Sequence, residues 1–497
     1  MNNNGNTALM IAAQNGHLDV VKELTKANAE VNTRDTEGWT ALMLAAEEGH
    51  FDILQELIKA DAEVNAKTPK ELTALMIAAQ NGHLEVVQKL IKAKAKVNTK
   101  NRNGLTALMR AAQNGRLEVV KELIKAKAEV NDRDTEGWTA LMIAAQNGHL
   151  DIVQELMKAN AEINVADNNE FTALMIAAYM GHLDVVKELI QTNADLNAAN
   201  RDGRTALMLA VTHGYLDIVK ELIKAKADLN AANRDGKTAL IIAVQEGYLD
   251  IVKELIKAKA DLNAANRDGD TALMLAVAHK YLDIVKELIK AKADLNARDK
   301  NEFTALMSAA YNGYLEVVQE LIKANAEMHV RDKNHQFTAL MWAAYMGDLE
   351  IVRELIKAKA EVNSITNNRD TVLMIAAQKG HLDVVKELIK ANADVNAANQ
   401  YGYTALLQAV KEDHLDVAKE LVKANADVNA ADQAGFTALI YAVCREHVPC
   451  VQFLLQAGAD REHKNRVGQI AYHFTIYFND DDAREKILKL LNEPITQ

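Results

Sequence analysis

Residues 233–265, NRDGKTALIIAVQEGYLDIVKELIKAKADLNAA, are one copy of a unit that recurs along the chain. The tripeptide Thr-Ala-Leu within this unit returns every 33 residues, at Thr7, Thr40, Thr73, Thr106, Thr139, Thr172, Thr205, Thr238, Thr271 and Thr304. One extra residue precedes Thr338, and the same step then resumes at Thr371, Thr404 and Thr437. A fixed period of this length, repeated in 14 copies, indicates a stack of similar structural units.

Each unit contains the signals for two short helices. Residues 233–236, Asn-Arg-Asp-Gly, favour a turn. Thr238 is suited to cap a first helix of about nine residues, and Gly247 is suited to end it. A second helix is predicted over residues 249–258, followed by an extended stretch that leads to the next turn.

Helices this short are not stable alone, so each unit must cover the apolar face of its neighbour. We therefore predict an all-α solenoid of helix-turn-helix repeats joined by short β-turn fingers. Residues 1–460 form the array of about 14 repeats. Residues 461–497 form a degenerate repeat and a C-terminal capping helix, which acidic residues open.

The repeated pattern Gly-x-Thr-x-Leu, Ala-Ala-x-x-Gly-His-Leu-Asp/Glu-Val-Val and Ala-Asp-Val-Asn strongly resembles the ankyrin repeat over about residues 1–470. Two departures are evident. Thr-Ala-Leu-Met replaces the family's Thr-Pro-Leu-His, and the Gly before Ala-Asp is mostly lost. Six repeats carry lysine in place of that Gly: Lys94, Lys127, Lys226, Lys259, Lys292 and Lys359. If the left-handed conformation is kept there, each lysine costs about 1 kcal/mol.

Composition narrows the classes of function. The formal charge is −12, which argues against nucleic acid as a partner. No apolar run approaches the length needed to cross a bilayer, so we expect no membrane insertion. The first residues lack the features of a signal peptide. With only two cysteines there is no disulfide framework, and we expect a cytoplasmic protein.

Repetition also argues against catalysis and metal binding. Histidine follows a conserved Gly in six repeats, at His17, His50, His83, His149, His182 and His381. Helices stacked about 8–10 Å apart cannot bring such rings onto one ion, so we interpret them as residues at the start of the second helix. Cys444, His447 and Cys450 are the one local set that looks like a group of metal ligands. We expect free thiols there, and no enzyme activity, metal or cofactor.

The resemblance implies that a protein partner binds the concave face. That face comprises the residue before each Thr, the finger turn, and the seventh and eighth residues after the Thr. Repeats seven to nine are polar there. We predict that aromatic residues and methionines at these positions and nearby bind the partner: Phe303, Tyr311, Phe337, Trp342, Tyr345 and Met346 in repeats ten and eleven, Phe171, Tyr179 and Met180 in repeat six, and Trp39 and Trp138.

Repeats ten and eleven are the favoured site, because His329 and the extra residue break the pattern at the same place. We expect Trp342 and Tyr345 to be exposed. Replacing both by Ala should then weaken binding at least about tenfold with little effect on thermal unfolding.

The sequence therefore favours a monomeric scaffold or adaptor that binds another protein. Similarity to the long, self-similar arrays of intracellular bacteria and protists extends this to an effector delivered into a host cell. Two alternatives stay open. A structural tether between cytoskeletal or membrane proteins would have several separate binding zones, and an enzyme that uses the groove would need a unique polar cluster.

Overall fold

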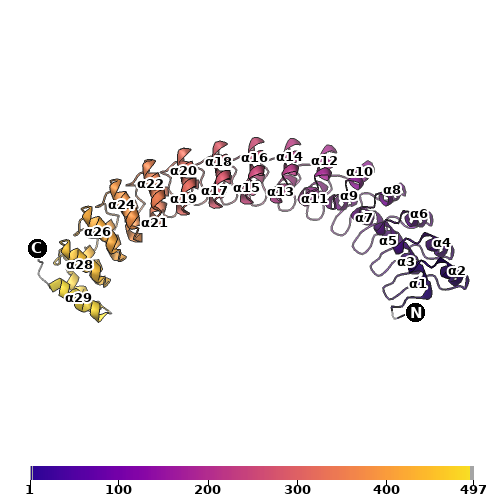
Figure 1. Ribbon diagram of the computed structural model, residues 1–497, viewed down its shortest axis with the longest axis horizontal. Coiled ribbons are helices and arrows are strands. Elements are labelled where there is room, and N and C mark those ends of the chain that lie inside the picture. The colour runs from indigo at the N-terminus through magenta and orange to yellow at the C-terminus, as the bar shows by residue number, and fades with distance from the viewer. Residues whose placement is uncertain (1, 3, 479, 493–497) are drawn as a thin grey trace. The chain divides into compact units, whose positions relative to one another are not determined.

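The computed structural model describes residues 2, 4–478 and 480–492. In this part the chain forms 29 α-helices and one 3-10 helix, with no sheet. The helices alternate between a first and a second helix of each repeat, as predicted (Figure 1). The chain divides into two compact units, residues 1–260 and 261–497.

The unit of residues 1–260 contains repeats one to eight. Its first helices are α1 Ala8–Gln14, α3 Ala41–Glu48, α5 Ala74–Asn81, α7 Ala107–Gln113, α9 Ala140–Gln146, α11 Ala173–Met180, α13 Ala206–Thr212 and α15 Ala239–Gln245. Its second helices are α2 Leu18–Lys26, α4 Phe51–Lys59, α6 Leu84–Lys92, α8 Leu117–Lys125, α10 Leu150–Lys158, α12 Leu183–Gln191, α14 Leu216–Lys224 and α16 Leu249–Lys257.

The unit of residues 261–497 contains the remaining repeats. Its first helices are α17 Ala272–Ala278, α19 Ala305–Tyr311, α21 Ala339–Met346, α23 Val372–Lys379, α25 Ala405–Lys411 and α27 Ala438–Cys444. Its second helices are α18 Leu282–Lys290, α20 Leu315–Lys323, α22 Leu349–Lys357, α24 Leu382–Lys390, α26 Leu415–Lys423 and α28 Val448–Gln456. The 3-10 helix η1 Ala471–Tyr477 and the last helix α29 Asp481–Asn492 follow.

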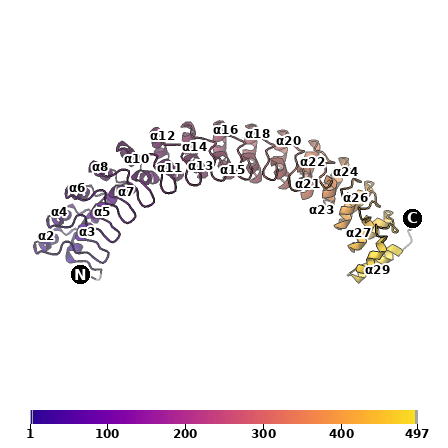
Figure 2. The same cartoon turned by 180° about the vertical axis from the view of Figure 1, so that it is seen from behind.

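Within each unit the first helices and the fingers lie on one side of the stack, and the second helices lie on the other (Figures 1 and 2). We call the first of these the finger side. Isolated antiparallel bridges close several fingers, for example between Ala166 and Thr172 and between Ile365 and Thr371. The turns that these bridges close are the short β-turn fingers expected from the sequence.

The repeated threonine caps every first helix. In repeat eight the Thr238 hydroxyl accepts a hydrogen bond from the backbone N–H of Ile241 at 3.4 Å, and the other threonines make the same bond. The capped helices are 7 or 8 residues long rather than about nine. They are shorter because the chain turns sharply at the Gly before the second helix, where Gly247 has φ +74°.

Burial follows the repeat pattern. In repeat eight, Leu240, Ile241 and Val244 of α15 and Val252 and Leu255 of α16 are almost fully buried. Within each of the two units, consecutive first helices pack on one another, and so do consecutive second helices. In each unit the core is therefore a continuous apolar layer between the two rows of helices, as a solenoid requires.

The histidines after the Gly join neighbouring repeats. The His83 ring donates from Nε2 to the Glu47 carbonyl of the preceding first helix at 2.8 Å. His50, His149, His182 and His381 make the equivalent bond at 2.9–3.3 Å, and so does His414, which follows Asp413. The ring also lies close to the equivalent Gly of the previous repeat. A Cβ added to Gly49 would be 2.5 Å from His83 Nδ1. These side chains thus cap the helix of the previous repeat and do not cap their own.

The asparagine of Asp-Val-Asn and its variants forms a second set of links between repeats. The Asn263 side-chain oxygen accepts from the backbone N–H of Asp294 at 2.8 Å. Equivalent bonds, 2.7–2.9 Å long, start at Asn32, Asn65, Asn98, Asn131, Asn164, Asn197, Asn296, Asn363, Asn396 and Asn429. Among the described residues, His329 at the same position makes no such bond. This link between repeats is therefore lost at the junction of repeats ten and eleven, where the sequence departs from the repeat pattern.

The six lysines that replace the family's Gly keep its left-handed backbone, with φ between +62° and +68°. Most other repeats have Asn at this position, such as Asn193 with φ +63°, and Asn tolerates this region better than lysine.

Within the described residues, no helix is long and apolar enough to cross a membrane.

Candidate protein-binding surface

The aromatic residues predicted in repeats ten and eleven form one cluster on the finger side, together with His335, which was not predicted. We call it the Trp342 cluster. It consists of Phe303, Tyr311, His335, Phe337, Trp342 and Tyr345. The ring centroids of the other five members lie 5.0–5.8 Å from that of Trp342. Such spacings are typical of favourable aromatic contacts.

Trp342 is the buried centre of this cluster, and the expectation that it is exposed was wrong. Its side chain is only 6 % exposed. It occupies the fourth position after the capping Thr, where other repeats have a buried Ile or Leu such as Ile375 or Leu209. The preceding repeat has the small Ser308 at this position. Ser308 and Trp342 both line a pocket of about 480 Å³, which we call the Trp342 pocket.

The finger of repeat eleven accommodates the extra residue. Its backbone bond from Asp332 N–H to the Phe337 carbonyl spans five residues, whereas the neighbouring finger spans four from Asp299 to Phe303. The Asp332 carboxylate accepts backbone hydrogen bonds from Asn334, His335 and Phe337 at 2.8–2.9 Å. The enlarged turn thereby places His335 against Trp342, with ring centroids 5.1 Å apart.

The accessible part of the surface comes from the ends of the first helices. Tyr311 is 42 % exposed and Met346 is 46 % exposed, while Tyr345 and Phe303 are half-buried. Tyr311, Tyr345 and Phe303 line the Trp342 pocket, and Met346 lies at the end of α21. The rings of Tyr311, Tyr345 and Phe303 pack on Trp342, which supports them from below.

A second aromatic cluster, the Tyr441 cluster, lies further along the finger side. It consists of Tyr403, Phe436, Tyr441 and Phe474, with centroids of successive rings 5.4–6.0 Å apart. The Tyr441 hydroxyl donates to Asp432 Oδ2 at 2.7 Å and lies 2.9 Å from the Tyr403 hydroxyl oxygen. Burial, together with these bonds, raises the pKa of Tyr441. The hydroxyl therefore remains a protonated donor that braces the finger.

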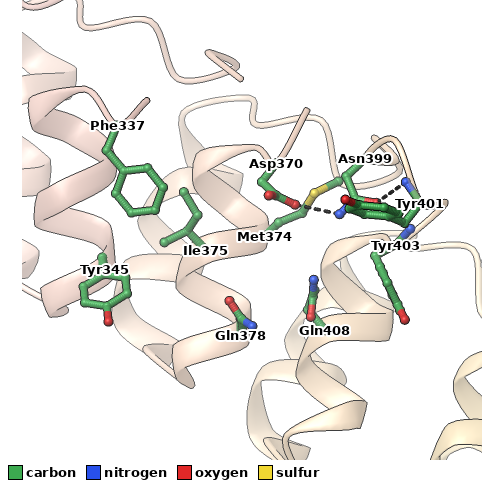
Figure 3. A pocket seen from close by; sticks show the side chains of 10 residues that line it. All are labelled: Phe337, Tyr345, Asp370, Met374, Ile375, Gln378, Asn399, Tyr401, Tyr403 and Gln408. Atoms are coloured by element: carbon green, nitrogen blue, oxygen red, sulfur yellow. Dashed lines mark hydrogen bonds between the residues drawn. The ribbon is translucent and has the colours of Figure 1, made fainter. Parts of the chain in front are cut away.

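Between the two clusters is a pocket of about 260 Å³, which we call the Tyr345 pocket (Figure 3). Phe337 and Tyr345 lie on one side of it and Tyr403 on the other, with Gln378 and Gln408 between them. Asp370 accepts a 2.6 Å hydrogen bond from Asn399 Nδ2 at its rim. The two clusters and two pockets make the aromatic surface longer than the sequence predicted.

Sequence reasoning missed Tyr401, Tyr403, Phe436 and Tyr441. Tyr403 and Phe436 each directly precede a capping Thr, so the rule that selected Phe303 and Phe337 could have found them. Tyr441 occupies the same fourth position as Trp342. Tyr401, at a finger tip, is 50 % exposed.

The residues predicted in repeats five and six gather in the unit of residues 1–260. Trp138, Phe171, Tyr179 and Met180 all line a pocket of about 290 Å³. Tyr179 and Met180 are exposed, whereas Trp138 and Phe171 are half-buried. Trp39 is half-buried in an earlier finger and lines none of the pockets described above.

The cysteine and histidine set has other partners. Cys450 donates to Asp413 Oδ1 at 3.4 Å, and His447 Nδ1 donates to the Val410 carbonyl at 2.9 Å. Burial raises the pKa of Cys444 to about 11 and that of Cys450 to about 12. Both thiols are free and protonated near neutral pH. Within the described residues, no group of three or more His, Cys, Asp or Glu side chains could hold a metal ion.

A family model described as ankyrin repeats in three copies matches the chain in overlapping segments that span residues 1–68 and 75–466. The chain therefore belongs to the ankyrin-repeat family. Members generally mediate contacts between proteins, and ankyrin repeats are the one family found. A comparison with curated proteins gave no match.

Proposed function

We propose that this protein is a scaffold or adaptor that holds another protein on its finger side. The main observation is the Trp342 cluster. It exposes Tyr311 beside a pocket of about 480 Å³, and the exposed Met346 lies at the end of the helix that carries Trp342. Tyrosine and tryptophan often dominate binding energy, and an aromatic patch rimmed by polar groups is typical of a protein-binding site.

Affinity capture from a cell lysate, followed by mass spectrometry, tests this proposal. The bait is the full chain, and the variant is Tyr311→Ser with Tyr345→Ser. We chose these two side chains because they line the pocket and are accessible. Loss of a captured protein, with unchanged helical content by circular dichroism, supports the proposal. Capture by the variant equal to that of the parent chain contradicts it.

A structural tether is the second candidate, and the Tyr179 and Met180 pocket in the other unit favours it. A matched variant, Tyr179→Ser with Met180→Ser, separates the two. A tether loses a different captured protein in each variant, whereas a scaffold with one dominant site loses its partner only in the Tyr311 variant.

The finer proposals are that the protein is a cytoplasmic monomer and an effector delivered into a host cell. The repeats are very similar to one another, as they are in the long arrays of intracellular bacteria and protists. The proposed effector role rests on this resemblance. Translocation of a tagged chain into cultured host cells during infection would test it.

A further inference from the structure

Basic side chains collect on the finger side of repeats eleven to fifteen. The relevant positions are the finger residues that precede each capping Thr, or Ile470 in the degenerate repeat fifteen, and the seventh and eighth residues after it. The residue that opens each turn is left out, because its side chain bonds to the turn itself. In these five repeats the positions carry two carboxylates, Asp370 and Glu412, and six cations: Lys333, Arg369, Lys379, Lys411, Arg445 and Arg466.

The same positions of repeats two to six carry the opposite balance. They have two cations, Lys70 and Arg102, and six carboxylates: Glu37, Glu47, Glu48, Glu71, Glu136 and Glu170. The whole chain has a net charge of −12. The basic stretch is therefore a local feature that the overall composition conceals.

The six cations are available to a partner. Among the described residues, none of them forms an ion pair with a carboxylate. Two of them lie over the aromatic rings that line the pockets. Lys379 Nζ is 4.3 Å from the centre of the Tyr345 ring, and Lys411 Nζ is 5.0 Å from that of Tyr403. Each of these two lysines therefore contacts an aromatic ring and places its positive charge beside the Tyr345 pocket.

The two aspartates that open fingers in this stretch, Asp332 and Asp432, do not neutralise these cations, because they bond within their own fingers. Asp332 accepts three backbone hydrogen bonds. Asp432 accepts from the Tyr441 hydroxyl and from the backbone N–H groups of Ala434 and Phe436.

Each pocket also contains a buried polar atom with no protein partner. Trp342 lines the Trp342 pocket, and its Nε1 donor is unpaired. Gln408 is only 9 % exposed and lies between the two sides of the Tyr345 pocket, with Oε1 unpaired (Figure 3). A buried unpaired polar group costs free energy. A peptide supplies both complementary groups, since its carbonyl oxygens accept and its N–H groups donate.

We propose that the finger side from the Trp342 pocket, which repeats ten and eleven form together, to repeat fifteen binds an extended acidic segment of another protein. Its apolar side chains lie in the Trp342 and Tyr345 pockets, and its carboxylates lie beside Lys379 and Lys411. This rests on the proposed function and specifies the partner's chemistry. Stacked helices lie about 8–10 Å apart, and an extended chain advances about 3.3 Å per residue. About every third residue of the segment therefore meets a new repeat.

Nucleic acid fits the surface less well. Its affinity depends on many closely spaced phosphate contacts, whereas these cations are spread over five repeats and interrupted by Glu412 and Asp370. A second copy of the chain, docking through its acidic stretch, is the other alternative. The experiment distinguishes both.

The test measures binding of a fluorescent peptide of about 15 residues, which spans about 50 Å when extended, to the full chain by anisotropy. Glu and Phe each recur at every third position of the peptide, with Ser between. Comparison peptides have Lys for Glu or Ala for Phe. The charge-reversal variant is Lys379→Glu with Lys411→Glu. The matched control, Lys70→Glu with Arg102→Glu, makes the same change in the acidic stretch.

We expect the Glu-Phe peptide to bind, and both comparison peptides to bind at least about tenfold more weakly. The Lys379 and Lys411 variant should lose at least about tenfold in affinity, and the control should stay within about twofold. Equal losses in both variants, equal binding of the Lys peptide, or no binding of the Glu-Phe peptide would overturn the inference. So would tighter binding of a single-stranded oligonucleotide, or dimerisation of the chain that the charge reversal abolishes.

Lysate capture separates this inference from the proposed function. If the Tyr311 and Tyr345 variant loses the cellular partner but the charge reversal keeps it, the partner is not acidic and the scaffold role stands. If both variants keep the partner, both proposals fail.

Discussion

At the scale of single residues, the lysines that replace glycine carry backbone strain. Lys226 has φ +66° at the end of its repeat. A left-handed conformation costs an L-residue about 1–2 kcal/mol, although glycine recovers only part of this because it is more flexible in the unfolded chain. We expect Lys226→Gly to stabilise the folded chain by about 0.5 kcal/mol.

Combining the change at Lys94, Lys127 and Lys226 should make the gain measurable, because distant sites add. Urea unfolding followed by circular dichroism is the measurement. Lys220→Gly, within α14, is the control and should destabilise by about 1 kcal/mol. A fall in the urea midpoint for the triple variant would show that these lysines are not strained.

His329 is a second residue with a specific cost, since the equivalent asparagines bond to the next repeat. We expect His329→Asn to form the missing bond to the backbone N–H of Glu361 and to stabilise the chain by about 1 kcal/mol. Hydrogen exchange should slow at the Glu361 amide. The reverse change, Asn296→His, should speed exchange at Glu327, whose N–H bonds to Asn296. Unchanged exchange at both amides would remove the asparagine ladder as a stabilising feature.

At the scale of helices, Trp342 is a core residue of α21 that also shapes the pocket. Its removal leaves a cavity beneath four aromatic rings and His335, so we expect Trp342→Ala to cost about 3–5 kcal/mol. Met346→Ala, at an exposed position of the same helix, should cost less than about 1 kcal/mol. Thermal unfolding distinguishes the two. Similar, small shifts for both variants would restore the expectation that Trp342 is an exposed contact residue.

The sequence predicted the helices because each signal in it acts locally. Thr238 caps its own helix, and Gly247 turns the chain a few residues later. The candidate surface was predicted less completely, because burial depends on neighbouring repeats. Trp342 is covered by rings from two fingers and two first helices. The link from His83 to Glu47 likewise joins residues 36 positions apart, which no short pattern reveals.

At the scale of the whole molecule, net charge proved a poor guide to the local surface. The value of −12 argued against nucleic acid, yet it gave no sign of the basic stretch in repeats eleven to fifteen. A sum over the chain loses the position of each charge. Comparing equivalent positions from repeat to repeat recovers that information, because within each unit the repeats place those positions on one side.

The stability of the molecule should also be local, because each repeat contacts only its neighbours. Helix α29 buries Ile487 and Leu491 and packs on α28 and η1. Its Leu491 carbonyl accepts a hydrogen bond from Arg461 Nη1 at 3.1 Å. Removing residues 480–497 exposes the apolar face that α29 covers, at a cost of about 1.5–3 kcal/mol for each large side chain.

We expect this truncation to accelerate hydrogen exchange in α26, α28 and η1 and to leave α1–α8 unchanged, since opening is local in such arrays. Mass spectrometry of peptides from the two regions provides the measurement. Arg484→Ala, an exposed change on α29, is the control and should affect neither region. Faster exchange throughout residues 1–260 would show instead that the chain unfolds as one cooperative body, and the nearest-neighbour account of its stability would then be wrong.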